Sequence, residues 1–281
     1  MKTVYYEHFK NLEVLLDTME NRELNAVFQK KDELTSQRVN IGGTWSGTET
    51  YEECMQVLRN GYKEPLDNMK KAVLKVGNMD NYVRPKAQND FVGFVPNVPN
   101  TLMGLPMTMI NRQKNPQKAK TIHLTYSFCV SSNVKTNDMI KAGTTFIGLV
   151  NSLEKQGYRV KIDMLACFTS DKNSMVYTVN LKEYSQTLNL LKLSFPLVHP
   201  SMLRRISFKW LETVPNLKDK DFMSGYGYPL SAIMRHDGTK ESEYLKSNGV
   251  MKGENSYYCN AYQAMKAENI EQLANKIGLV R

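Results

Sequence analysis

The residues best suited to chemistry are basic side chains gathered in one short stretch, "HPSMLRRISFKWLE" at residues 199–212. On a helix, Arg204, Arg205 and Lys209 lie within two turns, and Arg205 and Lys209 share one face because they are four residues apart. Arginine binds phosphate oxygens with two parallel hydrogen bonds, so this face is suited to nucleic-acid phosphates. The alternative is an ordinary solvated face on a helix that covers a sheet.

A second basic cluster comes directly before the first strand expected in the C-terminal half. It consists of Arg112, Lys114, Lys118 and Lys120. If this cluster lay beside the basic helix, the two would form a continuous positive surface. The sequence does not establish that adjacency.

Two tyrosines in "SGYGYP" at residues 224–229 could supply stacking surfaces. Tyr226 and Tyr228 carry rings that can stack on unpaired bases. The segment lacks the GxxxxGK[ST] spacing and the basic residue of a phosphate-binding loop. A tight surface loop with packed tyrosines is the alternative.

Cysteine and histidine are spread singly along the chain, as Cys54, Cys129, Cys167, Cys259, His8, His123, His199 and His236. No CxxC, HxxxH or HExxH spacing occurs, so no zinc site, disulfide framework or familiar metalloenzyme is predicted. No convergent catalytic group emerges either, and we expect no catalytic residue.

Composition favours a polyanionic partner. The net charge is +9 and the pI is about 9.2, which points to DNA or RNA first and to an acidic protein or membrane surface second. No segment approaches the roughly 18 apolar residues of a membrane span, and the first residues lack the apolar block of a secretory signal. We therefore expect a cytoplasmic protein without a membrane partner.

The N-terminal region reads as helical. Apolar spacing predicts amphipathic helix over residues 4–34 in one or two pieces, and Thr50 with Glu53 forms a capping box for a helix ending at Gly61. A further helix is expected over 65–76, so residues 1–76 are predicted to form a helical part.

Residues 77–117 contain five prolines and several apolar residues, and predict an extended segment that wraps around the core.

Residues 118–281 show an α/β pattern. Strands are expected at 121–130, 158–168 and 174–181, with a last strand within 256–265. Helices are expected at 138–156, 183–198, 200–214 and 268–277. A strand, a crossover helix and a second strand predict a mainly parallel, Rossmann-like sheet flanked by helices.

The order of strand 121–130, helix 138–156, strand 158–168 and closing helix 268–277 resembles a von Willebrand factor A-like domain. In that family the corner after the first strand carries Asp-x-Ser-x-Ser and holds Mg²⁺. Here the matching positions are Ser127, Cys129 and Ser131, so a serine replaces the aspartate. Mg²⁺ needs anionic oxygen ligands, so Ser127 and Ser131 are weak metal candidates. We expect no bound metal or other cofactor, and polar contacts within the protein or to a partner instead.

Three stretches resemble a poorly characterised family of phage and prophage proteins. They are "WSGTETYEECMQVLRNGY" at 45–62, "FVGFVPNVPNTLMGLPMTMI" at 91–110 and "LVHPSMLRRISFKWLE" at 197–212. The resemblance implies a mobile-element origin and transfers no catalytic residue.

Charge, basic clusters and this resemblance together predict a non-enzymatic nucleic-acid-binding protein in the host cytoplasm. The alternative is a protein-protein adaptor or virion assembly component, in which the corner grips a protein partner or a second copy of the chain.

Overall fold

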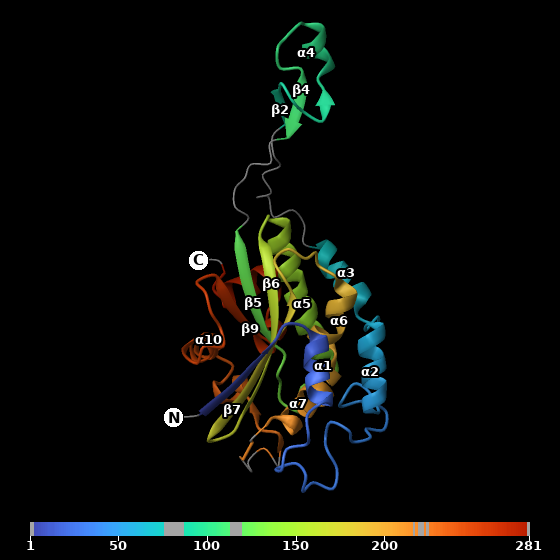
Figure 1. The fold of residues 1–281 in the computed structure, drawn as a ribbon, viewed down its shortest axis with the longest axis vertical. Coiled ribbons are helices and arrows are strands. Elements are labelled where there is room, and N and C mark those ends of the chain that lie inside the picture. The colour runs from blue at the N-terminus through green and yellow to red at the C-terminus, as the bar shows by residue number, and fades with distance from the viewer. Residues whose placement is uncertain are drawn as a thin grey trace.

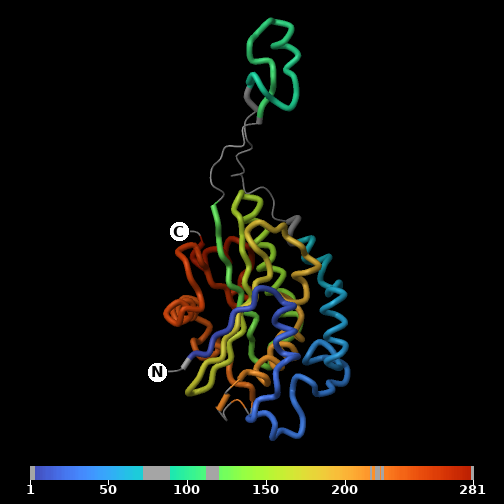
Figure 2. The backbone as a smooth tube through the Cα atoms, viewed as in Figure 1, coloured from blue at the N-terminus to red at the C-terminus, as the bar shows by residue number. Residues whose placement is uncertain are grey.

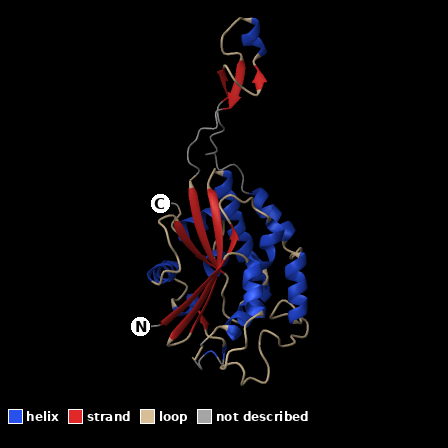
Figure 3. Ribbon diagram, viewed as in Figure 1, coloured by secondary structure: helices blue, strands red, loops and turns tan. Residues whose placement is uncertain are grey.

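A central sheet with helices on both faces forms the body of the protein (Figure 1, Figure 3). The structure is a computed structural model. It describes residues 3–75, 87–112, 120–215, 217–218, 222 and 225–279.

Five strands of the central sheet follow one another in the order β1-β7-β6-β5-β9, and the short β8 pairs with β6. Their bounds are β1 Thr3–Phe9, β5 Thr121–Ser127, β6 Arg159–Thr169, β7 Asn173–Lys182, β8 Tyr228–Pro229 and β9 Ser256–Asn260. β5 is parallel to β6 and β9, and β1 is parallel to β7, whereas β6 is antiparallel to β7 and β8. The sheet is therefore mixed and mostly parallel, which confirms the predicted α/β class.

Helices cover the sheet unequally. The larger core lies under α1 Leu12–Glu20, α2 Tyr51–Asn60, α3 Leu66–Lys75, α5 Thr136–Lys155, α6 Leu190–Val198, the π-helix η1 Met202–Ser207, α7 Phe208–Thr213, α11 Ala261–Met265 and α12 Ile270–Lys276. The smaller core lies under α9 Leu230–Ile233 and α10 Gly238–Ser247. In β6, Ile162 and Met164 face the larger core and Leu165 and Cys167 face the smaller one, as strand alternation requires.

None of the helices in the described ranges has the length and apolar character needed to cross a membrane.

The first residues of the chain form a strand where the sequence predicted a helix. Thr3–Phe9 is β1, and of the predicted 4–34 helix only α1 is helical. Within β1, Val4 and Tyr6 pack on the smaller core and Phe9 on the larger one, which is a two-residue alternation. Residues 3–9 thus belong to the central sheet and not to a helical part.

The predicted strand at 174–181 exists as β7, but its direction differs from a parallel βαβ arrangement. Only three residues separate the end of β6 at Thr169 from the start of β7 at Asn173. A connection this short permits an antiparallel hairpin, whereas a parallel pair needs a crossover of a dozen or more residues. By contrast, β5, α5 and β6 follow the prediction closely. The predicted cap of α2 is also present, because the Thr50 hydroxyl accepts a hydrogen bond from the Glu53 N–H at 3.1 Å.

Residues 87–112 form a small sheet of their own, where the sequence predicted extended chain along the core. The strands β2 Ala87–Asp90, β4 Met109–Arg112 and β3 Val95–Pro96 pair antiparallel in that order, and helix α4 Val98–Leu102 joins β3 to β4. This sheet lies apart from the central sheet (Figure 1, Figure 2). The other residues of the same predicted segment, 77–86 and 113–117, lie outside the described residues.

A buried arginine joins the N-terminal loop to the helices of the larger core. Arg205, in η1, is 0 % exposed. It donates six hydrogen bonds of 2.7–3.2 Å to the carbonyl oxygens of Ser36, Arg38, Thr48 and Glu49 and to the hydroxyls of Ser46 and Thr48. The loop at 36–49 has no helix or strand of its own, and this guanidinium supplies hydrogen bonds to four of its backbone oxygens.

We expect Arg205→Met to lower the free energy of unfolding by about 3–5 kcal/mol, because it removes six hydrogen bonds and leaves the buried Ser36 carbonyl unsatisfied. Urea unfolding followed by circular dichroism measures the change. Arg59→Met, at an exposed position of α2, is the matched control and should stay within about 0.5 kcal/mol of wild type. Equal effects of the two substitutions would show that the loop does not depend on Arg205.

Candidate functional site

A cavity of about 530 Å³ opens at the carboxyl ends of β5 and β6. Its wall includes the corner after β5 at 129–133, the end of β6, η1 with α7, and the loop at 225–227 together with β8, which follows it. Lys31, Thr35 and Trp45 from the N-terminal loops complete it. Ligands of open α/β sheets bind outside the carboxyl ends of the strands, so this cavity is the natural candidate site.

Five aromatic side chains line the cavity, namely Trp45, Phe168, Phe208, Tyr226 and Tyr228. Phe208 and Tyr226 stack with ring centroids 4.5 Å apart, and Trp45 lies 6.2 Å from Phe208. Tyr228 is 63 % exposed, whereas Tyr226 is only 3 % exposed. Tyr228 therefore offers a free aromatic face beside a wall of packed rings.

Arg204 is the buried cation of the cavity. Its guanidinium carbon lies 4.9 Å from the Trp45 ring centroid. Its nitrogens donate to the carbonyl oxygens of Trp45, Ser132 at 3.2 Å and Val134 at 3.0 Å. Burial lowers the pKa of Arg204 to about 10, so the side chain still carries its charge at neutral pH. Arg204 thus holds the corner after β5 against the N-terminal loop.

Lys31 is the second cation in the wall. Its ammonium lies 4.5 Å from the Tyr226 ring centroid and 5.4 Å from that of Phe28. Burial lowers the pKa of Lys31. Among the described residues, neither Lys31 nor Arg204 forms an ion pair with a carboxylate. The cavity therefore presents positive charge that an anionic ligand can neutralise.

A buried carboxylate fixes the wall from behind. Glu212 is 1 % exposed and accepts hydrogen bonds from the Ser36 N–H and hydroxyl and from the Tyr226 hydroxyl. Burial raises the pKa of Glu212. The Tyr226 hydroxyl also accepts from the Thr35 N–H at 3.0 Å. These bonds hold Tyr226 at φ 59°, a left-handed conformation that non-glycine residues rarely adopt.

The structure brings together three of the residues predicted to bind nucleic acid. Arg204, Tyr226 and Tyr228 all line the cavity. The predicted exposed basic face is wrong for Arg204 and Arg205, which are 2 % and 0 % exposed, because both donate to backbone carbonyls inside the protein. Lys209 is half-buried, with its ammonium 4.5 Å from the Tyr51 ring centroid.

The second basic cluster does not join this site in the described structure. Arg112 ends β4 in the small sheet, and Lys120 is an exposed residue directly before β5. Lys114 and Lys118 lie outside the described residues. The continuous positive surface stays a prediction.

Sequence patterns did not single out Lys31, Trp45 or Phe208 as site residues. Lys31 and Trp45 lie in loops far from the α/β region, and no periodicity connects them to it. Trp45 did carry a usable signal, because it is one of two tryptophans and stands in the glycine-rich stretch "IGGTWSG". A large aromatic side chain in such a loop is a candidate binding surface.

The corner serines have different positions. Ser127 is 3 % exposed at the end of β5. Ser131 lines the cavity. Its N–H donates to the Tyr262 hydroxyl at 2.9 Å, and that hydroxyl donates to the Ser131 hydroxyl at 3.2 Å. Across the described ranges, no group of three His, Cys, Asp or Glu side chains is arranged to hold a metal. Ser131 thus contacts the protein itself.

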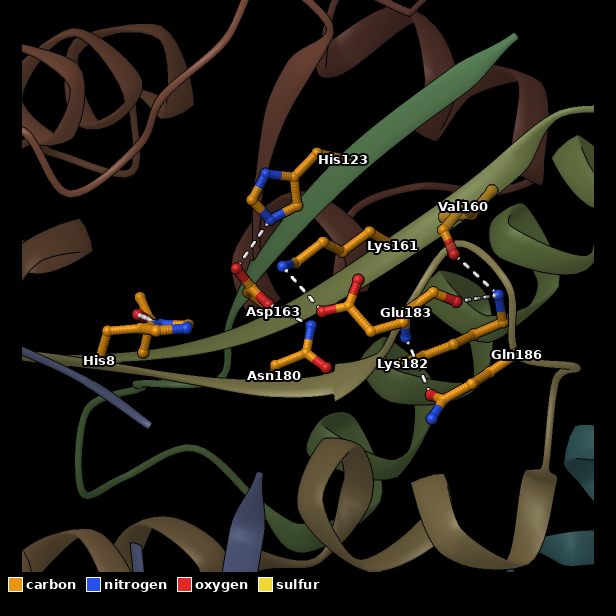
Figure 4. A network of polar contacts seen from close by, with 10 residues as sticks. His8, His123, Val160, Lys161, Asp163, Asn180, Lys182, Glu183 and Gln186 are labelled. Atoms are coloured by element: carbon orange, nitrogen blue, oxygen red, sulfur yellow. Dashed lines mark hydrogen bonds and ion pairs between the residues drawn. The ribbon is translucent and has the colours of Figure 1, made fainter. Parts of the chain in front are cut away.

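A second polar group lies on β5, β6 and β7 (Figure 4). Asp163 lies 2.8 Å from Nε2 of His123 and accepts from the Asn180 amide at 2.9 Å. Burial by itself would raise the pKa of Asp163, but these contacts lower it. A carboxylate that orients an imidazole is typical of general-base sites. Here Asp163 is only 6 % exposed, and Ser256, which pairs with His123 from β9, is only 2 % exposed. A substrate would therefore have little access to this group. We therefore interpret the group as a cross-strand support.

Glu241 is a buried acid on the other side of the sheet from α5. It is 0 % exposed and accepts from the Tyr258 hydroxyl at 2.6 Å and the Asn260 amide at 2.7 Å. Burial raises its pKa to about 7. The protonated form therefore fits the folded state, and ionisation above neutral pH destabilises the fold.

We expect Glu241→Gln to remove part of the pH dependence of stability. The folded pKa lies above the unfolded one, so the stabilising contribution is complete at pH 4 and is lost as the pH rises through 7. Between pH 4 and pH 8.5 the wild type should lose on the order of 3 kcal/mol more unfolding free energy than the variant. Urea unfolding at both pH values measures this.

Glu243→Gln, at an exposed position of the same helix, is the matched control and should keep the wild-type pH dependence. A Glu241→Gln variant with the same pH dependence as wild type would show that Glu241 ionises normally in the folded protein.

Comparisons with known proteins give a family and no characterised relative. A search of curated proteins and a search of solved structures find no significant match to the chain. A family model described as "Domain of unknown function (DUF7192)" matches residues 1–280. Since this match covers nearly the whole chain, the protein belongs to the DUF7192 family.

Proposed function

We propose that this protein binds single-stranded nucleic acid and holds an unpaired base at the aromatic cavity. The observation that carries the proposal is the combination, in one cavity of about 530 Å³, of five aromatic side chains with Arg204 and Lys31. Proteins that bind single strands combine aromatic stacking surfaces with positive charge that follows the backbone. The net charge of +9 supports the same class of ligand.

Each part of the cavity has a distinct role in this proposal. The exposed ring of Tyr228 stacks on a base, and the Trp45 and Phe208 rings provide an apolar wall for it. Arg204 and Lys31 attract the phosphate, because charges in a partly enclosed apolar wall act through a low dielectric. An unpaired base can enter such a cavity and a paired base cannot, so single strands should be preferred over duplexes.

The proposal includes one inference about fold and one about origin. We infer that residues 118–281 are a degenerate von Willebrand A-like domain, and the order β5, α5, β6 and α12 supports this. The resemblance of the three sequence stretches supports a phage or mobile-element origin, with a role in the host cytoplasm or in the virion.

Fluorescence anisotropy with labelled DNA and RNA, single-stranded and duplex, tests the proposal over 50–200 mM salt. Wild type should bind single strands more tightly, with an affinity that falls steeply as salt rises. Tyr228→Ala should weaken binding roughly 5- to 150-fold, since stacking on one base contributes about 1–3 kcal/mol. Tyr228→Phe keeps the ring and should bind as wild type does.

Lys31→Gln tests the phosphate contact. It should weaken binding and lower the slope of affinity against salt by about one unit on logarithmic axes. Lys246→Gln, an exposed position on α10 with the same loss of charge, is the control and should keep the slope. If no oligonucleotide binds at 50 mM salt, or if Tyr228→Ala binds as wild type does, the cavity is not a nucleic-acid site.

A further inference from the structure

The small sheet at 87–112 concentrates the exposed apolar surface of the protein. Fourteen large apolar side chains are exposed in the described ranges, and nine of them lie between residues 91 and 107. They are Phe91, Val92, Phe94, Val95, Val98, Leu102, Met103, Leu105 and Met107, each exposed by 44–83 %. Exposed apolar surface gathered in this way marks an interaction site.

The exposure belongs to a defined fold and not to irregular chain. The Phe94 N–H donates to the Ile110 carbonyl at 3.1 Å, and the Asn97 N–H donates to the Thr108 carbonyl at 2.7 Å. The chain passes so close to β4 at Gly93 that a Cβ there would lie 2.3 Å from the Ile110 carbonyl oxygen. The apolar side chains are thus presented by a hydrogen-bonded scaffold.

Within the described ranges, no other part of the chain covers this surface. The small sheet lies apart from the central sheet (Figure 1, Figure 2). It is a single layer of three short strands with the five-residue helix α4. A domain needs a second packed layer to bury an apolar face, and another molecule can supply that layer here.

Charge indicates which molecule supplies that layer. From Phe91 to Asn111 the chain contains no Asp, Glu, Lys, Arg or His, although 23 % of all residues are charged. Two copies of the chain, each carrying +9, repel one another at other faces. This uncharged apolar surface can meet its own copy without opposing like charges, and it has no cation with which to hold a nucleic acid.

We propose that residues 87–112 form a self-association module, in which the apolar faces of two copies of this chain pack against each other. A twofold contact uses the same patch on both subunits, and an uncharged apolar patch is complementary to itself. A stable interface buries about 800 Å² per partner, and nine large side chains exposed by 44–83 % provide an area of that order. The module acts independently of the cavity.

Light scattering coupled to size exclusion, on the full chain between about 1 and 100 μM, tests this proposal. The wild type should have twice the mass of the 32.2 kDa chain. Leu102→Asp puts an unpaired carboxylate into the apolar contact of each copy and should raise the dissociation constant at least tenfold. Leu102 is 83 % exposed, so circular dichroism should show an unchanged fold.

Ile41→Asp is the matched control, because Ile41 is 89 % exposed but lies in the N-terminal loop. It should leave the dimer intact, and Val92→Asp should repeat the effect of Leu102→Asp. Oligonucleotide affinity per chain should be the same for wild type and Leu102→Asp, so failure of this proposal is distinguishable from failure of the nucleic-acid proposal.

Self-association is overturned by a wild-type chain that stays monomeric at 100 μM, or by a dimer that persists in both the Leu102→Asp and Val92→Asp variants. A monomeric wild type is then tested with vesicles of phosphatidylcholine and phosphatidylglycerol, and the second result of interest is that it sediments with them when Leu102→Asp does not. That second result would make a lipid surface the occupant of the patch.

Discussion

The hydrogen bonds of the Arg205 guanidinium are the interaction on which the site depends. A buried cation without a carboxylate partner is stable only when its donors are satisfied, and Arg205 meets this requirement through oxygen atoms of the loop at 36–49. The same bonds satisfy carbonyls that no helix or strand pairs. This loop carries Trp45, so the anchoring of Arg205 places one wall of the cavity.

Arg204 extends this arrangement from the loop to the sheet. The π-helix η1 places two consecutive arginines inside the protein. Arg205 fixes the N-terminal loop, and Arg204 connects that loop with the corner after β5. Inserted π-turns often mark functional sites, and here the turn lies beside the cavity. Arg205 thus stabilises the N-terminal loop, while the adjacent Arg204, with different partners, supplies positive charge to the cavity.

The two surfaces of interest differ in chemistry. The cavity combines aromatic rings with cations and lies where parallel strands end, as ligand sites of α/β sheets do. The small sheet is apolar and uncharged from Phe91 to Asn111. Because they lie on separate sheets, a ligand can occupy the cavity while another protein surface covers the small sheet.

The sequence by itself determined the elements that have a strong local signal. Periodicity located β5, α5 and β6, and the Thr50 hydroxyl with a glycine at 61 located α2, because these patterns depend on residues close together in the chain. β1 was missed because its few residues adjoin the helical pattern of α1. The small sheet was missed because its many prolines obscure strand periodicity in strands of two to four residues.

Only the tertiary structure decided which residues form the site. Arg204, Tyr226 and Tyr228 were candidates from their chemical types, but the sequence could not distinguish an exposed arginine from one buried against the Trp45 carbonyl, 159 residues away. Lys31 and Trp45 reach the cavity through loops whose positions depend on those same contacts. The type of a residue determines which interactions its side chain can make. Burial and long-range hydrogen bonds determine which of those interactions it does make, and both arise only when distant segments of the chain pack together.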